Sequence, residues 1–108
     1  MTRYLFLCAE GQQRSPTAAT VARRLAARQG WRLEADSGGI NYVRPAAVPD
    51  LQARYDRYIV MEQYMADRLV ALGVELTRIT VLDIPDHYER GAPDLTQLLE
   101  EQLAKVLQ

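Results

Sequence analysis

The sequence predicts an α/β fold, a single three-layer domain in which a four-stranded parallel sheet carries helices on both faces. Short apolar runs, typical of buried strands, alternate with amphipathic segments of helical period along the whole chain. No repeat, low-complexity tract or linker interrupts this alternation. A chain of 108 residues has room for one core, so we expect residues 1–108 to form one domain.

The N-terminus predicts a strand, a loop and a helix. A continuous apolar run over residues 4–7 ends at Cys8 and suits a strand buried on both faces. A loop containing glycine follows, and Ser15-Pro16 is typical of an N-cap and a first helical residue. The helix keeps its apolar residues on one face as far as Gly30, a residue that commonly ends helices.

The other three strands are predicted from shorter runs. Loose alternation indicates a strand over residues 32–37, and apolar, β-rich runs indicate two more over residues 58–61 and 79–82. The stretch 40–49 contains two prolines and no period, so we expect a surface loop there.

The remaining helices follow the second and later strands. Residues 50–55 predict a brief helix, and apolar residues at helical spacing predict another over residues 65–72. The clearest element is the last helix, for which Asp94 as N-cap and Gln97 three residues later form a capping-box pattern. Its apolar face comprises Leu95, Leu98, Leu99, Leu103, Val106 and Leu107. In such a sheet, ligands bind outside the carboxyl ends of the strands, where the first and fourth strand loops would open.

Charge and cysteine content exclude several classes of protein. Thirteen Lys and Arg against 14 Asp and Glu give a net charge of −1, which provides no field that attracts nucleic acid or an anionic membrane. The N-terminal apolar run is far too short to span a membrane and lacks a signal-peptide cleavage pattern. One cysteine and one histidine allow no intrachain disulfide and no Cys/His zinc site, so we expect a cytoplasmic protein without a metal or organic cofactor.

The loop that follows Cys8 carries what phosphate chemistry needs. A loop that wraps before a helix N-terminus directs backbone N–H groups inward, and the helix dipole adds positive charge. Gly11 allows a positive φ there, and the planar fork of Arg14 can hold two phosphate oxygens. The same environment stabilises a Cys8 thiolate as nucleophile, with the Ser15 hydroxyl as a donor to it. The loop residues expected to contact substrate are Ala9, Glu10, Gly11, Gln12, Gln13 and Ser15.

The departing oxygen of a phosphate ester also needs a proton. An aspartate in the loop after the fourth strand can donate it if the side chain is partly buried, and that loop offers Asp83 and Asp86. Asp83 is better suited to capping the end of the strand.

Four motifs in the same order resemble the low-molecular-weight protein tyrosine phosphatases. They are Cys8-x5-Arg14-Ser15-Pro16-Thr17, Asp36-Ser37-Gly38-Gly39, Val60-Met61-Glu62 and Ile84-Pro85-Asp86-His87-Tyr88, and they span nearly the whole chain. The resemblance implies that Cys8 is the nucleophile, Arg14 the phosphate clamp and Asp86 the general acid. It also implies that Tyr88 lines the mouth of the pocket and that Ser37 braces the phosphate loop.

Three loop residues depart from the pattern of that family. Glu10 and Gly11 stand where the family usually has Gly and Asn, so the side-chain bridge from Asn to Ser37 is lost. A carboxylate at Glu10 would oppose thiolate formation and repel substrate unless it points outward. Gln13 stands where many members have a second cysteine, so no protective disulfide is expected.

The expected function is hydrolysis of a phosphate monoester through a phosphocysteine intermediate. By resemblance, the substrate is phosphotyrosine on a protein or a small aryl phosphate, and the product is inorganic phosphate. Three alternatives stay open. Gln12 matches neither phosphotyrosine nor phosphoarginine enzymes, which leaves a protein-arginine phosphatase. An arsenate-reductase-like enzyme would have to use external thiols, and Glu10 with Gly11 makes a non-catalytic module that binds phosphate or phosphoproteins credible.

Overall fold

A parallel β-sheet forms the centre of the computed structural model, which describes residues 1–107. The four strands are β1 (Thr2–Cys8), β2 (Leu33–Gly39), β3 (Arg57–Val60) and β4 (Ile79–Val81). They pair in the order β2-β1-β3-β4, and every pair is parallel. All four predicted strands are therefore present. Because the chain leaves β1 for β2 on one side and later reaches β3 on the other, the carboxyl end of β1 lies at the switch point of the sheet.

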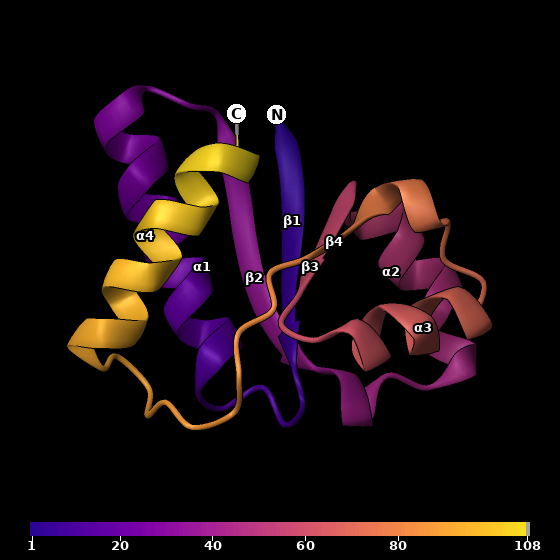
Figure 1. Ribbon diagram of the computed structural model, residues 1–108. Helices are drawn as coiled ribbons and strands as arrows, with labels where there is room; N and C mark the ends of the chain where they lie inside the picture. Colours follow the sequence, from indigo (N-terminus) through magenta and orange to yellow (C-terminus); the bar gives the residue numbers. More distant parts are fainter. Residues whose placement is uncertain (108) are drawn as a thin grey trace.

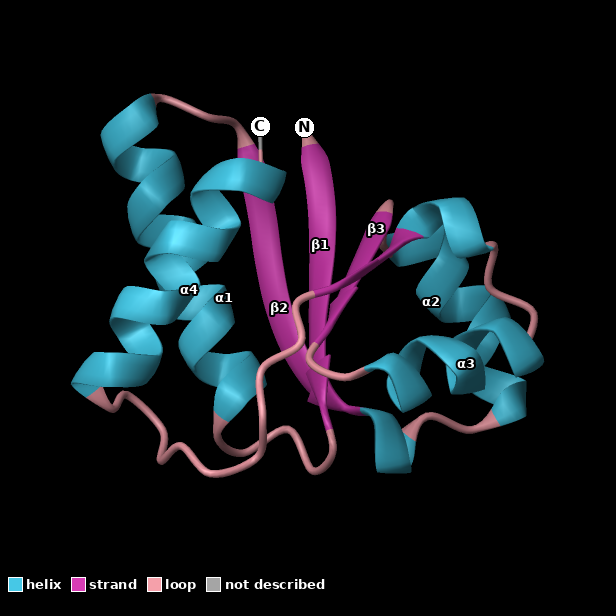
Figure 2. Ribbon diagram, in the orientation of Figure 1, coloured by secondary structure: helices cyan, strands magenta, loops and turns pink. Residues whose placement is uncertain are grey.

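Helices cover both faces of this sheet (Figures 1 and 2). The helices are α1 (Arg14–Gln29), α2 (Val48–Arg54), α3 (Gln63–Ala71) and α4 (Pro93–Val106). Figure 1 shows α1 and α4 side by side on one face, and α2 and α3 on the other. This arrangement confirms the predicted three-layer α/β class. No helix in the part of the chain that the structure describes is long and apolar enough to cross a membrane.

The core lies between the sheet and its two helical layers. Leu5, Phe6 and Leu7 of β1 are all buried, as the continuous apolar run requires of a central strand. On α4, the buried apolar side chains recur every four residues, as a helix that packs on one face must place them. They are Leu95, Leu99, Leu103 and, just beyond the helix, Leu107.

The prediction that Ser15 caps α1 is wrong. The helix begins at Arg14, and Gln13 is its N-cap, without a side-chain cap hydrogen bond. Ser15 is the second helical residue and is fully buried. A hydroxyl before proline is a local cap signal, but here the Ser15 hydroxyl is used by the site described below.

The capping box predicted for the last helix is also wrong. The helix starts at Pro93, with Ala92 as N-cap, because proline at the first helical position has a φ that already suits a helix. The Asp94 carboxylate instead accepts a hydrogen bond from the Leu95 backbone N–H at 3.0 Å.

The predicted loop over residues 40–49 is partly helical. It contains two short 3-10 turns, Ile40–Tyr42 and Pro45–Ala47, and α2 begins at Val48, two residues before the helix expected there. Proline at N1 or N2 starts both the second turn and α2, which explains how a segment without a period forms these turns.

Candidate active site

The loop between β1 and α1 surrounds the sulfur of Cys8. This thiol is buried at the end of the strand, and its Sγ lies 3.2 Å from the Ser15 hydroxyl oxygen. Burial alone raises the pKa of Cys8, but hydrogen bonds from the Ser15 hydroxyl and from the backbone N–H groups of Ser15, Gly11 and Gln13 outweigh it. They lower the pKa below its ordinary value of 9.0. The loop therefore favours the thiolate, as predicted.

The loop rests directly on the end of β2. Gly11 has a φ of +75°, and a Cβ there would lie 2.8 Å from the backbone of Gly38 and of Gly39. A Cβ on Gly39 would lie 2.6 Å from the backbone carbon of Glu10. Only glycine permits this approach of two backbones. Backbone packing thus replaces the side-chain bridge that Gly11 removes.

The Ser15 hydroxyl makes the brace that was predicted for Ser37. It donates to the Gly38 carbonyl oxygen at 3.0 Å, while the exposed Ser37 hydroxyl makes no hydrogen bond to the described part of the loop. A hydroxyl has one proton, so Ser15 can donate either to Gly38 or to the Cys8 thiolate. If the Ser15 hydroxyl donates to the Cys8 thiolate, it no longer donates to the Gly38 carbonyl oxygen. Ionisation of Cys8 is therefore coupled to the contact between the loop and β2.

Arg14 is the most unusual side chain of the site, since it is charged yet only 1% exposed. Its Nη1 donates to Glu62 Oε2 at 2.7 Å and to the Ile84 carbonyl oxygen at 2.6 Å. The other edge of the fork is almost bare, because Nε has no hydrogen-bond partner and Nη2 has only Asp86 Oδ1, at 3.7 Å. A buried N–H without an acceptor is costly, so this edge is suited to binding an anion.

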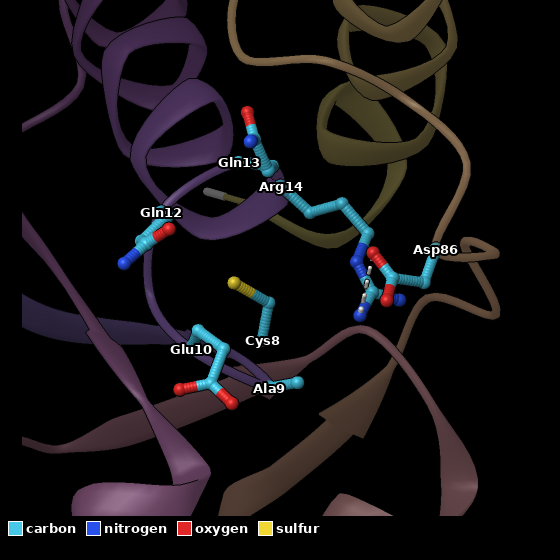
Figure 3. A pocket seen from close by; sticks show the side chains of 7 residues that line it. All are labelled: Cys8, Ala9, Glu10, Gln12, Gln13, Arg14 and Asp86. Atoms are coloured by element: carbon cyan, nitrogen blue, oxygen red, sulfur yellow. Dashed lines mark ion pairs between the residues drawn. The ribbon is translucent and has the colours of Figure 1, made fainter.

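Asp86 reaches the pocket from the segment that follows β4. Its carboxylate faces the free edge of Arg14 in Figure 3, where the dashed line marks this ion pair. The side chain is 67% exposed, so the partial burial expected of a proton donor is not found. Its competitor Asp83 does not line the pocket, and it makes no side-chain hydrogen bond to the residues described, so the predicted strand cap is wrong. Asp83 lies in the irregular segment after β4 and has a φ of +62°.

The pocket itself is a small cavity of about 80 Å³ above the sulfur. Its lining, drawn in Figure 3, consists of Cys8, Ala9, Glu10, Gln12, Gln13, Arg14 and Asp86. This volume is far below the roughly 300–1,000 Å³ of pockets for drug-sized ligands, so it suits a small anionic group. Most of the predicted loop residues thus line one cavity, whereas Gly11 and Ser15 are not among its lining residues.

Comparison with solved structures identifies the fold. No protein-family model and no curated protein sequence matches the chain. The low-molecular-weight protein tyrosine phosphatase of T. tengcongensis superposes with a TM-score of 0.78 at 17% identity, over 99% of this chain and 98% of that one. The low-molecular-weight phosphotyrosine phosphatase of Vibrio cholerae gives 0.77 at 13% identity, over 99% and 95%. The chain has the fold of the low-molecular-weight protein tyrosine phosphatases. The YwlE arginine phosphatase has this fold too, with a TM-score of 0.70 at 19% identity, over 98% of this chain and 95% of that one.

Glu10 points away from the sulfur of Cys8 (Figure 3). Its carboxylate accepts hydrogen bonds from the Tyr42 hydroxyl at 2.7 Å and from Asn41 Nδ2 at 2.9 Å, and Figure 3 shows it directed away from the Cys8 sulfur. These two hydrogen bonds lower the pKa of Glu10, so the group is ionised at neutral pH. The condition under which Glu10 is compatible with a thiolate is therefore met.

Gln13, which stands where many members of the family have a cysteine, joins the loop to the segment after β4. Its Oε1 accepts a hydrogen bond from the Arg90 backbone N–H at 2.6 Å, and Thr17 Oγ1 next to it accepts one from Gly91 at 2.9 Å. These contacts tie the segment after β4 to the start of α1. They hold the segment that carries Asp86 beside the loop that follows Cys8.

Tyr88 is not among the residues that line the cavity, and its place at the pocket mouth stays a prediction. It is half-buried against the core, and its ring stacks with that of His87 at a centroid distance of 4.2 Å. A large aromatic ring gains more from apolar contact than from exposure at a rim.

Two groups of residues at the site were not predicted. Glu62 lies in a quoted motif but had no assigned role, and Tyr42 and Asn41 fell in the predicted surface loop. The contact of Glu62 with Arg14 could have been predicted, because a carboxylate just after the third strand lies at the same edge of the sheet as Arg14.

Proposed function

We propose that the protein is a cysteine-dependent phosphatase that hydrolyses phosphate monoesters, with phosphotyrosine on a protein as its substrate. The observation that carries this proposal is the half-satisfied Arg14 guanidinium. It is buried and anchored through Nη1, its Nε is unpartnered, and the side chain lines a cavity together with a thiol whose pKa is lowered. A phosphoryl group would supply acceptors for that edge of the fork and for the inward N–H groups of the loop.

The first half-reaction transfers the phosphoryl group to sulfur. The Cys8 thiolate attacks phosphorus in line with the leaving oxygen, so that an S–P bond forms as the P–O bond breaks. Loop N–H groups and Arg14 stabilise the charge on the equatorial oxygens. Asp86 delivers its proton to the departing oxygen, which leaves as the free alcohol or phenol.

The second half-reaction releases phosphate. Asp86, now a carboxylate, accepts a proton from a water molecule as that water attacks the phosphocysteine. The S–P bond breaks, inorganic phosphate forms, and Cys8 returns as a thiolate. The exposed position of Asp86 suits this role, since both its proton and the attacking water must reach the mouth of the cavity.

Among the other functions considered, the arginine phosphatase is supported by one observation, the fold shared with YwlE. Of the two residues that favour a non-catalytic binding module, Glu10 and Gly11, the outward position of Glu10 weakens the argument from the first. We place the protein in the cytoplasm, where a lone reactive thiol stays reduced.

Two variants test the proposed mechanism with an aryl phosphate. Cys8→Ser is expected to lose turnover but to keep binding of phosphate and vanadate, because the loop donors and Arg14 remain. Mass spectrometry of rapidly quenched wild-type enzyme should find the phosphoryl group on Cys8. Turnover that survives in Cys8→Ser would refute the nucleophile.

Asp86→Asn tests the proton donor, with Asp83→Asn as its matched control. Asp86→Asn should slow esters with poor leaving groups far more than activated aryl phosphates, because only the former need a proton in the transition state. Asn tolerates the positive φ at position 83, so the control should show no such discrimination. If the two variants exchange behaviours, Asp83 is the acid.

A further inference from the structure

The mouth of the cavity is acidic, although we propose that its floor binds an anion. Three charged residues line it, namely Glu10, Arg14 and Asp86. Arg14 is only 1% exposed, and Glu62 neutralises it at 2.7 Å. The two charges that face solvent are therefore both carboxylates, and Figure 3 shows them on opposite sides of Cys8. Arg90 contacts Gln13 through its backbone N–H, and its side chain is not part of this lining.

Glu10 is fixed in this position. Its two side-chain hydrogen bonds come from Asn41 and Tyr42, and the Asn41 backbone N–H also donates to the Ala9 carbonyl oxygen at 3.1 Å. The backbone of Glu10 is also packed closely against Gly39, which restricts where this residue can lie. A carboxylate has about four lone-pair positions, so about two remain for a partner from solvent. A group held in this way loses little conformational entropy when it binds a cation.

An acidic rim acts differently on the two parts of a phosphorylated peptide. The phosphoryl group is held by the loop donors and by the free edge of Arg14, which together outweigh the rim. The residues beside the phosphorylated one lie at the rim itself, where carboxylates attract cations and repel other carboxylates.

We propose that Glu10 is a specificity residue that selects phosphorylated peptides with arginine or lysine next to the phosphorylated residue. This inference rests on the proposed function, because it takes the free edge of Arg14 as the place of the phosphoryl group. The Arg14 Nε has no hydrogen-bond partner, and Glu10 lines the same cavity, so a residue beside the bound phosphoryl group would lie near the Glu10 carboxylate.

The test compares three phosphotyrosine peptides that differ only in the flanking residues, which are arginine, alanine or aspartate. At low ionic strength, we expect kcat/KM to favour the arginine peptide over the aspartate peptide by about tenfold, since exposed ion pairs are individually weak. The preference should shrink in high salt, because the Debye length falls from about 10 Å at 0.1 M to about 3 Å at 1 M.

Three variants assign the preference to the charge of Glu10. Glu10→Gln keeps the shape of the side chain and should reduce the arginine-to-aspartate ratio by about threefold. Tyr42→Phe removes one of the two side-chain hydrogen bonds that orient Glu10 but no charge, so it should reduce the ratio less than Glu10→Gln does. Glu101→Gln removes an exposed carboxylate on α4 and should retain the ratio. The ratio is read within each variant, so it does not depend on the level of activity.

A ratio near one in the wild type, or an unchanged ratio in Glu10→Gln, would overturn the inference. A loss of ratio in Tyr42→Phe as large as in Glu10→Gln would do the same, because it would show that Glu10 only ties the Ile40–Tyr42 turn to the loop. If the protein turns over no peptide and no aryl phosphate, the proposed function fails. The inference is then decided by the dissociation constants of the same peptides for Cys8→Ser, which should keep the order arginine, alanine, aspartate.

Discussion

Replacement of Arg14 by lysine separates the two tasks of this side chain. Arginine anchors itself through Nη1 to Glu62 and to the Ile84 carbonyl, and it keeps Nε and Nη2 for the substrate. Lysine has one terminal nitrogen, which can take the anchor or the phosphate but cannot hold both in the geometry of a fork. Each hydrogen bond to a charged group contributes about 1.5–3 kcal/mol, so the loss of two, partly offset by the retained charge, costs about 3–4 kcal/mol in the transition state. Since each 1.36 kcal/mol is tenfold in rate, kcat/KM should fall by about 10²–10³.

The same variant has a small effect on stability, and this distinguishes a functional loss from a folding defect. Lysine can still pair with Glu62 but leaves the buried Ile84 carbonyl with a poorer donor, at a cost of about 1 kcal/mol, or a few degrees in Tm. The ion pair with Glu62 adds little to this cost, because that carboxylate is about a third exposed and screened by water.

The assay measures kcat/KM on an aryl phosphate and Tm side by side. Arg24→Lys is the matched control, since it makes the same exchange at an exposed site of the same helix and should change neither quantity. A loss of activity below about tenfold in Arg14→Lys, with the fold intact, would refute the assignment of Nε and Nη2 to the phosphoryl group.

Two further predictions concern the loop. The lowered pKa of Cys8 predicts that the pH midpoint of its alkylation by iodoacetamide lies below 9.0, and Ser15→Ala should move it upward, because the Ser15 hydroxyl makes the largest lowering contribution. A thiol with a lowered folded-state pKa adds stability that is fully present above its unfolded pKa and is lost as the pH falls through the folded value. Urea unfolding at several pH values measures whether the free energy of unfolding changes in this direction. A free energy of unfolding that declined as the pH rose through this range would contradict the prediction. Gly11→Ala should lower Tm far more than Gly30→Ala, because both residues have a positive φ but only the Cβ at position 11 meets backbone, at 2.8 Å. Equal losses of Tm would mean that the contact between loop and β2 relaxes freely.

The core elements were predictable because their signals are local. The apolar run of β1 and the recurrence of leucine every four residues on α4 are both patterns within one short segment of the sequence. Both elements formed where they were expected. Helix starts were less predictable, because a cap signal competes with other uses of the same side chain. Ser15 has the sequence of a cap, yet its hydroxyl bonds Cys8 and Gly38.

The sequence by itself determined the α/β class, the strand order along the chain and the pairing of Cys8 with Arg14, since the loop that joins them is contiguous and short. Only the tertiary structure decided how those residues are supported. Glu62 anchors Arg14 from 48 positions away, and Tyr42 turns the Glu10 carboxylate outward from 32 positions away. No local period or spacing encodes such contacts, because they arise when the carboxyl ends of separate strands meet at one edge of the sheet. Whether a carboxylate near a thiolate opposes it or faces solvent is then decided by the hydrogen-bond donors that the neighbouring element brings to it.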